Sequence, residues 1–344
     1  MAACWRELAR RPGVELLVVA EHSHRPNGEP IYDPKLLEGV NARLLSTAEL
    51  HDTDLVLQIV REWRPKAVGL CGWHIPSLRH LALSKDMGHV RFVMGMDTHR
   101  KGTLRQALGR YYRASYFRRI ERVICASERT WQLGLTLGFD ESQLRRGFYG
   151  IDAHQFDGVM DRRMATPGGW PRQFLYVGRY IPEKAIDVLC DAYTRYRASV
   201  SDPWPLVTCG EGPEGHHIAS TAGVENRGYL QPYHLPDRYA ESGVFVIASR
   251  YEPWGVVLAE AAYSGLPILC TEACGAALDV VRSFYNGQSV TTGDPEAMAR
   301  GMVWMHENGH RLPELGQRSR ALAGAYTAEI WADRWEAVFR ELVG

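Results

Sequence analysis

The sequence has no apolar run near the roughly 20 residues that a membrane-spanning helix needs. It also lacks the pattern of a secretory leader, because Glu7 and Glu15 fall where a signal peptide is uninterrupted and apolar. We therefore expect a cytoplasmic protein. Its 344 residues are 45% apolar and 23% charged, which is typical of globular proteins, and the chain is too long for one ordinary core.

Cysteine is sparse, and its spacing indicates neither disulfides nor a metal site. There are seven cysteines, an odd number, and none forms a CxxC pair. Cys270 and Cys274 are close in sequence, but no His or Cys stands at a usable ligand spacing, so we expect no bound metal. Four thiols in or beside strand-like apolar runs are expected to be buried in a reducing compartment: Cys71, Cys125, Cys209 and Cys270.

Net charge is zero, yet its distribution is uneven. Residues 1–150 hold 23 Lys and Arg against 16 Asp and Glu, and the rest holds 17 against 24. The basic excess concentrates in residues 100–119, which contain no acidic residue and have Leu, Tyr and Phe interleaved. This stretch fits a solvated helix face beside a core stripe, or a surface for an anionic membrane or acceptor. No nucleic-acid motif accompanies it, so nucleic acid is not an expected partner.

Strand-sized apolar runs alternate with helix-like segments along the whole chain. The runs are VELLVVAE, AVGLCG, VRFVMGMD and RVICAS in the first half, and FLYVGR, PLVTCGEG, VFVIAS and PILCTE in the second. Strands that are almost continuously Val, Ile and Leu are typical of parallel sheets covered by helices on both faces. Two such series predict an α/β protein with two doubly wound, Rossmann-like domains.

The domain boundary is predicted where MDRRMATPGGWPRQ, residues 160–173, interrupts both patterns. The domains are then residues 1–160 and 161–325, followed by an amphipathic helix over residues 326–344. The chain opens on a helix-like segment, CWRELARR, whereas doubly wound domains usually open on a strand. Either that strand is absent or the recorded start lies downstream of the real one.

Ligands of doubly wound folds bind outside the carboxyl ends of the strands, so the loops there are candidate sites. After FLYV come Gly178, Arg179 and Lys184. Glycine lets the backbone approach a ligand, and two cations at a helix entrance suit a diphosphate. The alternative is an ordinary salt-bridged turn between strand and helix.

The loop after VFVIAS reads SRYEPWGVVLAEA and carries two carboxylates, Glu252 and Glu260. Gly255 marks the expected start of a helix, where the free amides of Gly255, Val256 and Val257 suit a phosphate or a sugar edge. Each carboxylate can accept hydrogen bonds from sugar hydroxyls. Separately, Glu252 is equally well explained as a charge favoured by the dipole at a helix N-terminus, and Glu260 as surface charge. With Arg179 and Lys184 they form a candidate site.

Two other loops are weaker candidates. Gly210 lies in GEGP after the strand PLVTC, and Tyr229 and Leu230 lie in RGYL further along. Their glycines can admit a ligand, but neither motif is specific alone.

Taken in order, GRYIPEKAIDVL, CGEGPE, RGYL, SRYEPWGVVLAEAAYSGLPIL and NGQSV resemble the family 4 retaining glycosyltransferases of the GT-B fold. The likeness is close over residues 173–294, where the E-x7-E element with GR and EK ahead of it is specific. It is looser in the first half, over ICASERTWQLGLTLGFDESQLRRGFYGIDAHQF. The resemblance implies two domains facing a central cleft, with the last helix crossing back to the first domain.

The resemblance also implies roles for the candidate residues. Arg179 and Lys184 would hold the donor diphosphate as it leaves, and Glu252 would contact donor sugar hydroxyls. Glu260 would hold the nucleotide ribose. The remaining donor-binding positions would be Gly178, Gly210, Tyr229, Leu230, Gly255, Val256 and Val257. The reaction would be metal-independent hexosyl transfer from a nucleotide diphosphate sugar to an acceptor hydroxyl, with no cofactor and with retained anomeric configuration.

The first half departs from the family pattern. Many members have His before Asp at the end of a strand, whereas VRFVMGMDTH has Met96 before Asp97 and places His99 two residues later. Asp97 or His99 is therefore the candidate for the reacting sugar. Trp73, after AVGLC, is either an acceptor-stacking ring or a packed core residue.

Two other functions share this architecture: a sugar-nucleotide epimerase, and a non-catalytic sugar-nucleotide-binding protein. The donor sugar, nucleotide base and acceptor are chosen by residues that form no motif. The acceptor is expected to be a carbohydrate, a lipid-linked molecule or another small molecule, and the basic stretch at 100–119 adds a peripheral position on the inner membrane face as a hypothesis.

Overall fold

The computed structural model describes residues 1–22, 33–99 and 102–344, and the side chains of residues 105 and 107 also lie outside this description. The described chain forms two compact units. One consists of Met1–Gly150 with Thr327–Gly344, and the other of Ile151–Tyr326. Arg100 and Lys101 of the basic stretch lie outside the described residues.

The chain passes into the second unit after residue 150, whereas the sequence pattern places the boundary after residue 160. The Ile151 amide donates to the Tyr326 carbonyl over 2.8 Å, and the ring of Phe156 lies edge-on against Tyr239. Residues 151–160 therefore belong to the second core. The Pro/Gly-rich segment that suggested a linker lies inside that unit, before its first strand.

The second unit is built on a six-stranded parallel sheet in the order β12-β11-β10-β7-β8-β9. Its strands are β7 (Phe174–Val177), β8 (Leu206–Cys209), β9 (Val224–Asn226), β10 (Val244–Ile247), β11 (Ile268–Thr271) and β12 (Gly287–Val290). Every residue of β7, β8, β10 and β11 is buried, as their continuous apolar runs predict.

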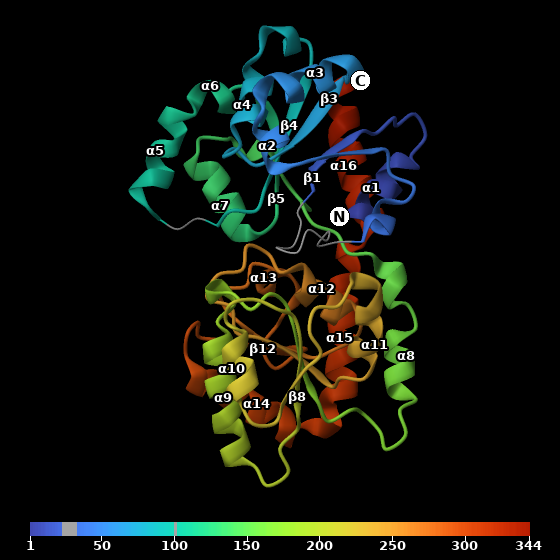
Figure 1. Ribbon diagram of the computed structural model, residues 1–344, viewed down its shortest axis with the longest axis vertical. Coiled ribbons are helices and arrows are strands. Elements are labelled where there is room, and N and C mark those ends of the chain that lie inside the picture. The colour runs from blue at the N-terminus through green and yellow to red at the C-terminus, as the bar shows by residue number, and fades with distance from the viewer. Residues whose placement is uncertain (23–32, 100–101) are drawn as a thin grey trace. The chain divides into compact units, whose positions relative to one another are not determined.

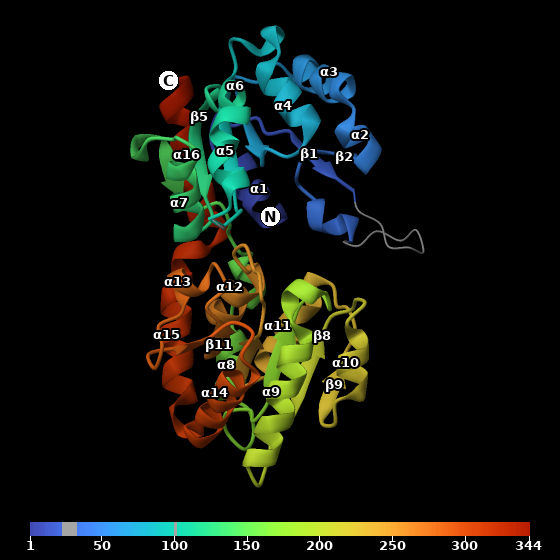
Figure 2. The ribbon, with the colours of Figure 1, turned by 90° about the vertical axis from the view of Figure 1, so that its left-hand side faces the viewer.

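Helices cover both faces of this sheet (Figures 1 and 2). One group contains α9 (Ile186–Ser199), α10 (Gly215–Ser220) and α14 (Pro295–Glu307), with α9 against α14. The other contains α8 (Val159–Met164), α11 (Leu235–Ala240), α12 (Val256–Tyr263), α13 (Ala277–Val280) and α15 (Leu312–Ala323), with α8 against α11 and α12 against α15. The doubly wound domain predicted for the second half is present.

A fully buried arginine joins three segments of this second group. Arg163, on α8, is 0% exposed and donates to the carbonyls of Tyr239, Ser242, Ser264 and Gly265. Its guanidinium also lies 5.0 Å from the centre of the Trp170 ring. Because carbonyl oxygens rather than a carboxylate surround it, Arg163 satisfies backbone groups at the ends of α11 and α12.

The first unit contains two parallel sheets. The larger has the order β3 (Ala67–Cys71), β4 (Arg91–Met96), β5 (Ile120–Cys125) and β6 (Leu144–Arg146), and β1 (Val18–Glu21) pairs separately with β2 (Ala42–Leu45). Among the described strands, β3 therefore pairs on one side only, with β4. Cys71, at the end of β3, is exposed, so the expectation that it is buried is wrong; Cys125, Cys209 and Cys270 are buried.

The helices of the first unit follow the predicted alternation. They are α1 (Ala2–Ala9), α2 (Thr47–His51), α3 (Thr53–Trp63), α4 (Pro76–Leu83), α5 (Leu104–Tyr112), α6 (Ala114–Phe117) and α7 (Glu128–Thr136), with α16 (Ala328–Val343) at the chain's end. Asp52 begins α3 and Thr327 begins α16 by accepting hydrogen bonds from first-turn amides, which are otherwise unsatisfied.

The last helix, α16, belongs to the first unit, as the GT-B expectation requires. It packs beside α1, at the opposite end of the sequence (Figure 1). The indole nitrogens of Trp331 and Trp335 donate to the carbonyls of Phe148 and Gly147 over 2.8 and 3.3 Å. Gly69 on β3 leaves room for this helix, since a Cβ there would lie 3.1 Å from the Trp335 ring.

Candidate functional site

The candidate residues of the second unit gather where the sheet order reverses. The chain leaves β7 for β8 on one side, while β10 pairs with β7 on the other. The loops after β7 and β10 therefore lie next to each other at the carboxyl ends of their strands. This switch point is where open α/β sheets bind ligands.

Lys184 and Glu252 meet there as an ion pair. Lys184 ends the short helix η5 (Pro182–Lys184), and its ammonium pairs with the carboxylate of Glu252 in the loop after β10. The two side chains are only 14% and 9% exposed. Burial strengthens the attraction, and it also makes either charge costly without the other. The sequence placed both residues in one crevice, but it did not predict that they pair.

The two loops are also joined by backbone and side-chain contacts. The amides of Arg250 and Tyr251 donate to the Glu183 carbonyl over 2.8 and 3.1 Å. The Arg250 guanidinium grips both carboxylate oxygens of Asp187 over 2.8 and 2.5 Å. On the other side, the Gly275 amide donates to the Glu252 carbonyl over 3.0 Å.

Arg179 differs from Lys184 in having no carboxylate partner among the described residues. Its side chain is exposed and forms no hydrogen bond or ion pair with a described residue. Its carbonyl accepts from the Tyr176 hydroxyl over 3.0 Å, which fixes the turn after β7. Burial, followed by the Glu252 carboxylate, holds the pKa of Tyr176 well above its ordinary value, so this hydroxyl stays a donor. An uncompensated cation on a fixed turn suits an anionic ligand.

Gly255 begins α12 in a conformation that favours glycine. Its φ is +101°, and a Cβ there would lie 3.1 Å from Cγ of Glu252. Within the described structure, the amides of Gly255, Val256 and Val257 donate to no group, and no side chain caps the helix. These amides can donate to a phosphate or to hydroxyls near Glu252.

Glu260 lies further along α12 and is partly buried. The Tyr239 hydroxyl donates to its carboxylate over 3.3 Å. Burial raises the pKa of Glu260 to about 7. Its charge state therefore changes near neutral pH, and the carboxylate form is the stronger acceptor for a diol.

The glycines after β8 have a structural role that the sequence did not indicate. A Cβ on Gly210 would lie 1.9 Å from the carbonyl oxygen of Gly178, and one on Gly212 would lie 2.3 Å from that of Tyr180. Glycine is needed because the two loops touch through their backbones. This contact places Gly178 and Gly210 side by side at the switch point.

Tyr229 and Leu230 follow β9, at the edge of the sheet, and are partly buried. Their role at the nucleotide base stays a prediction. Gly228 just before them has φ +68° and donates its amide to the Asn226 side chain over 2.9 Å.

The first unit carries the other candidates at the carboxyl end of β4. Asp97 accepts a hydrogen bond from the Tyr149 hydroxyl over 2.8 Å, and its carbonyl accepts from Thr130 over 3.3 Å. His99 is buried at 5% exposed. Trp73 packs on Phe117 with ring centres 5.3 Å apart, which favours the core interpretation of that residue.

Several residues that contact the candidate site residues were not predicted from the sequence. Arg250 and Asp187 are 63 residues apart, and Tyr239 reaches Glu260 from another helix. Their only signal is position: Asp187 follows Lys184 by three residues, and Arg250 precedes Glu252 by two. Without the sheet order, nothing pairs one loop with the other.

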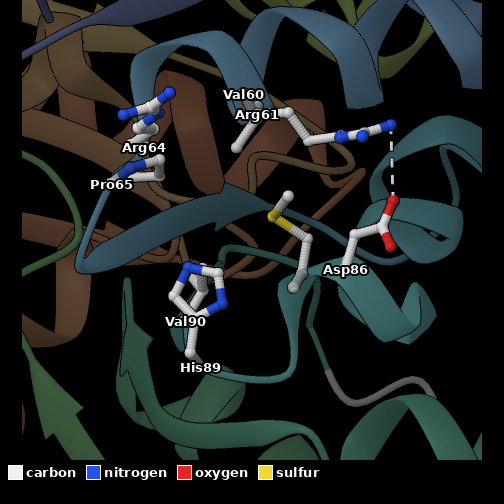
Figure 3. A pocket seen from close by; sticks show the side chains of 8 residues that line it. Val60, Arg61, Arg64, Pro65, Asp86, His89 and Val90 are labelled. Atoms are coloured by element: carbon white, nitrogen blue, oxygen red, sulfur yellow. Dashed lines mark ion pairs between the residues drawn. The ribbon is translucent and has the colours of Figure 1, made fainter.

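A hollow of about 470 Å³ opens in the first unit between the end of α3 and the turn before β4 (Figure 3). Arg61 pairs with Asp86 across it over 3.4 Å, and His89 and Arg64 line it. Pro65 and Val90 place it at the amino ends of β3 and β4, which is the end of a doubly wound sheet that does not bind ligands.

Among the described residues, no helix is long and apolar enough to cross a membrane. Within the same part of the chain, no group of three or more His, Cys, Asp and Glu side chains is placed to hold a metal ion.

Comparison with known proteins shows what the second unit is similar to. Residues 165–322 match the family model Glycosyl transferases group 1. D-inositol 3-phosphate glycosyltransferase of Salinispora tropica is 31% identical over 166 residues, which are 44% of this chain and 33% of that protein. Lipopolysaccharide core biosynthesis glycosyltransferase LpsE of Rhizobium meliloti is 27% identical over 227 residues, 65% of each. The matches thus span between a third and just under two thirds of these relatives' length.

Solved structures resemble the chain over almost its full length. A glycosyltransferase from Rickettsia africae has a TM-score of 0.77 at 13% identity, covering 99% of this chain and 94% of that one. Anabaena HepE in complex with UDP and glucose has a TM-score of 0.75 at 16% identity, covering 99% and 95%. At these identities the likeness shows the fold, which is GT-B. Residues 165–322, within the second unit, are thus similar to the glycosyl transferases group 1 family.

Proposed function

We propose that the chain is a glycosyltransferase that moves a hexosyl group from a nucleotide diphosphate sugar to an acceptor hydroxyl, retaining the anomeric configuration. The observation that carries this proposal is the buried Lys184–Glu252 pair at the switch point of the second unit, with the exposed Arg179 in the same loop as Lys184. Named relatives support it: both curated relatives above are glycosyltransferases, and Anabaena HepE was crystallised with UDP and glucose.

In this reaction the bond between the sugar's anomeric carbon and the diphosphate breaks, and the acceptor oxygen forms a bond to the same carbon. Negative charge develops on the leaving diphosphate while the sugar becomes oxocarbenium-like. Arg179 and Lys184 stabilise that charge, since fixed cations in a partly dry site need no reorganisation. A phosphate oxygen of the donor takes the acceptor proton, so neither a resident metal nor a cofactor is required.

The other residues bind and orient the donor. Glu252 accepts from sugar hydroxyls, the amides of Gly255 to Val257 donate at the sugar and phosphate edge, and Glu260 holds the ribose diol. Asp97 or His99 of the first unit acts at the reacting sugar. Retention then follows from delivery of the acceptor on the face that the diphosphate leaves.

A thermal-shift screen with UDP-, GDP-, ADP- and dTDP-sugars tests the proposal, because a ligand of the folded state raises the melting temperature. We expect one nucleotide class to raise it and its sugar to be slowly hydrolysed without acceptor. Interconversion of two donor sugars would indicate an epimerase instead. Binding without hydrolysis or transfer would indicate a binding protein.

Replacing Glu260 with glutamine should weaken nucleotide binding about tenfold or more, because a charge-assisted hydrogen bond contributes about 1.5–3 kcal/mol. The pKa of Glu260 is about 7, so the protonated fraction grows below that pH and wild-type affinity should fall from pH 8 to pH 6. Calorimetry with UDP and GDP measures both effects. Glu307→Gln, at an exposed site at the end of α14, is the control. If the variant has wild-type affinity and an unchanged pH profile, Glu260 does not bind the nucleotide.

We further propose that the protein works at the inner face of a membrane, with α5 on the lipid surface. Leu104, Leu108, Tyr111 and Tyr112, at i, i+4, i+7 and i+8, are 81%, 45%, 67% and 78% exposed. Such spacing gives one apolar helix face. Arg110, Arg113 and Arg118 are exposed around it, and Arg110 lies 4.9 Å from the Tyr111 ring centre. Apolar rings bordered by arginine suit an anionic bilayer.

Flotation with phosphatidylglycerol vesicles should carry the wild type at 20 mM salt and much less at 500 mM, because salt screens exposed charges. Replacing Leu104 and Tyr112 with serine should reduce flotation at least about threefold, since less apolar area enters the interface. Vesicles of phosphatidylcholine alone are the control. A wild type that stays with the unfloated fraction at low salt would refute the membrane position.

A further inference from the structure

Lys184 and Asp187 belong to one rigid piece of chain. Lys184 ends η5, Ala185 adopts the left-handed region at φ 54°, and Asp187 stands in the first turn of α9. The Ala185 amide closes η5 on the Pro182 carbonyl over 3.2 Å, and the Ala185 carbonyl begins α9 by accepting from Leu189 over 3.1 Å. Because these hydrogen bonds join η5 to α9, a contact that holds Asp187 in place also holds the backbone of Lys184.

Arg250 and Glu252 belong to a second piece, the loop after β10. The Arg250 guanidinium donates to both carboxylate oxygens of Asp187 in the first piece, and the Arg250 backbone amide donates to the carbonyl of Glu183. Its guanidinium also approaches the Pro182 carbonyl at 3.4 Å. Arg250 thus contacts three residues of the first piece, Pro182, Glu183 and Asp187, and several contacts define an orientation as well as a distance.

The Asp187–Arg250 pair is on the surface, unlike Lys184–Glu252. Its side chains are 38% and 43% exposed. Exposed ion pairs contribute little to overall stability, whereas a two-pronged arginine–carboxylate contact holds a fixed geometry. The hydrogen bond to Arg250 lowers the pKa of Asp187, so the carboxylate remains charged at neutral pH.

We propose that Arg250 and Asp187 are positioning residues that set where Glu252 meets Lys184 in the donor site. The inference rests on the proposed function, in which these two side chains hold the sugar and the leaving diphosphate. When a diphosphate draws on the Lys184 ammonium, the Asp187–Arg250 contact keeps the Glu252 loop in place. Glu252 then stays available to sugar hydroxyls and does not follow Lys184.

The chain offers a matched control on the same helix. Arg195 grips Asp191 over 2.9 and 3.2 Å, with side chains 52% and 46% exposed. This pair joins two residues one turn apart on the same helix, α9. Arg195→Gln therefore removes a similar contact without touching the loops.

The experiment compares Arg250→Gln, Arg250→Lys, Asp187→Asn and Arg195→Gln with the wild type. Without any ligand, hydrogen exchange at the amides of Arg250 and Tyr251 should accelerate about tenfold in Arg250→Gln and Asp187→Asn. Melting temperatures should stay within about 2 °C, as for other exposed ion pairs. Arg195→Gln should change neither quantity.

Turnover gives the functional readout, with UDP-glucose and GDP-mannose hydrolysis as probes. We expect kcat to fall about tenfold in Arg250→Gln, with KM changed less than about threefold, because misplacement of reacting groups is felt mainly in turnover. Arg250→Lys keeps the charge but not the two-pronged contact, so its kcat should lie between those of the wild type and Arg250→Gln.

Unchanged exchange at Arg250 and Tyr251, or equal effects in Arg195→Gln, would overturn the inference. These results need no donor, so they decide the inference even where neither sugar is hydrolysed. Absence of hydrolysis by the wild type with every donor in the screen counts against the proposed function and leaves the exchange result standing. Accelerated exchange with unaltered kcat in an active enzyme would also overturn the positioning role.

Discussion

Replacing Lys184 with alanine should lower turnover of the nucleotide sugar about 10²-fold, and Arg179→Ala should lower it at least tenfold. Removing one preorganised charge donor from a transition state typically costs about 2.7–4 kcal/mol. Lys184 carries the larger expected effect because its loss also leaves Glu252, only 9% exposed, without its counter-charge. Steady-state hydrolysis of the donor identified by the thermal-shift screen measures the change.

Loss of the buried pair also predicts lower stability in Lys184→Ala. Adding Glu252→Gln should restore much of that stability, since no unpaired charge remains, while turnover stays low. This double variant separates chemistry from folding. Lys66→Ala, at an exposed site in the first unit, is the control. If both cation variants retain wild-type turnover, the assigned donor site is wrong.

Replacing Arg163 with methionine should reduce the free energy of unfolding of the second unit by about 3–5 kcal/mol. The change strands four carbonyls, those of Tyr239, Ser242, Ser264 and Gly265, that a buried guanidinium satisfies. Each buried acceptor left without a donor costs about 1–3 kcal/mol, partly relieved by relaxation and water entry. Urea denaturation followed by tryptophan fluorescence gives the value.

The neighbouring Arg162 provides the comparison for Arg163. It pairs with Asp237 on the surface over 2.8 Å, with side chains 51% and 58% exposed. Arg162→Met should therefore cost less than about 1 kcal/mol. Similar losses in the two variants would show that Arg163 is not the anchor that its four contacts indicate.

The strands that could be predicted are those whose burial leaves a continuous apolar run. FLYV, LVTC, VFVI and ILCT each became a fully buried strand of the second sheet. β2, β6, β9 and β12 are short or carry exposed residues, and their sequences do not differ from loops. The split of the first unit into two sheets depends on hydrogen bonding between strands, which no local pattern records.

The residues and loops of the candidate donor site could be predicted from the sequence, but their geometry could not. The prediction of Gly178, Arg179, Lys184 and Glu252 as site residues rested on the chemistry of glycine, cations and carboxylates. The contacts between the loops after β7 and β10 join positions more than 60 residues apart, as in the 68-residue separation of Lys184 and Glu252. Arg163 was not predicted for the same reason: an arginine on a short polar helix has the sequence pattern of surface charge, and only the fold brings the carbonyls at the ends of α11 and α12 to it.

The place of α16 has a consequence for biosynthesis. Residues 151–326 form a continuous unit, whereas the first unit also needs Thr327–Gly344, with Trp331 and Trp335 bonded to the Gly147–Phe148 turn. Domains generally fold as their chain emerges from the ribosome. Here all residues of the second unit are translated before α16 is, so the second unit can fold first. The first unit can complete its fold only after α16 is translated, when the tryptophans of that helix can pack over β3.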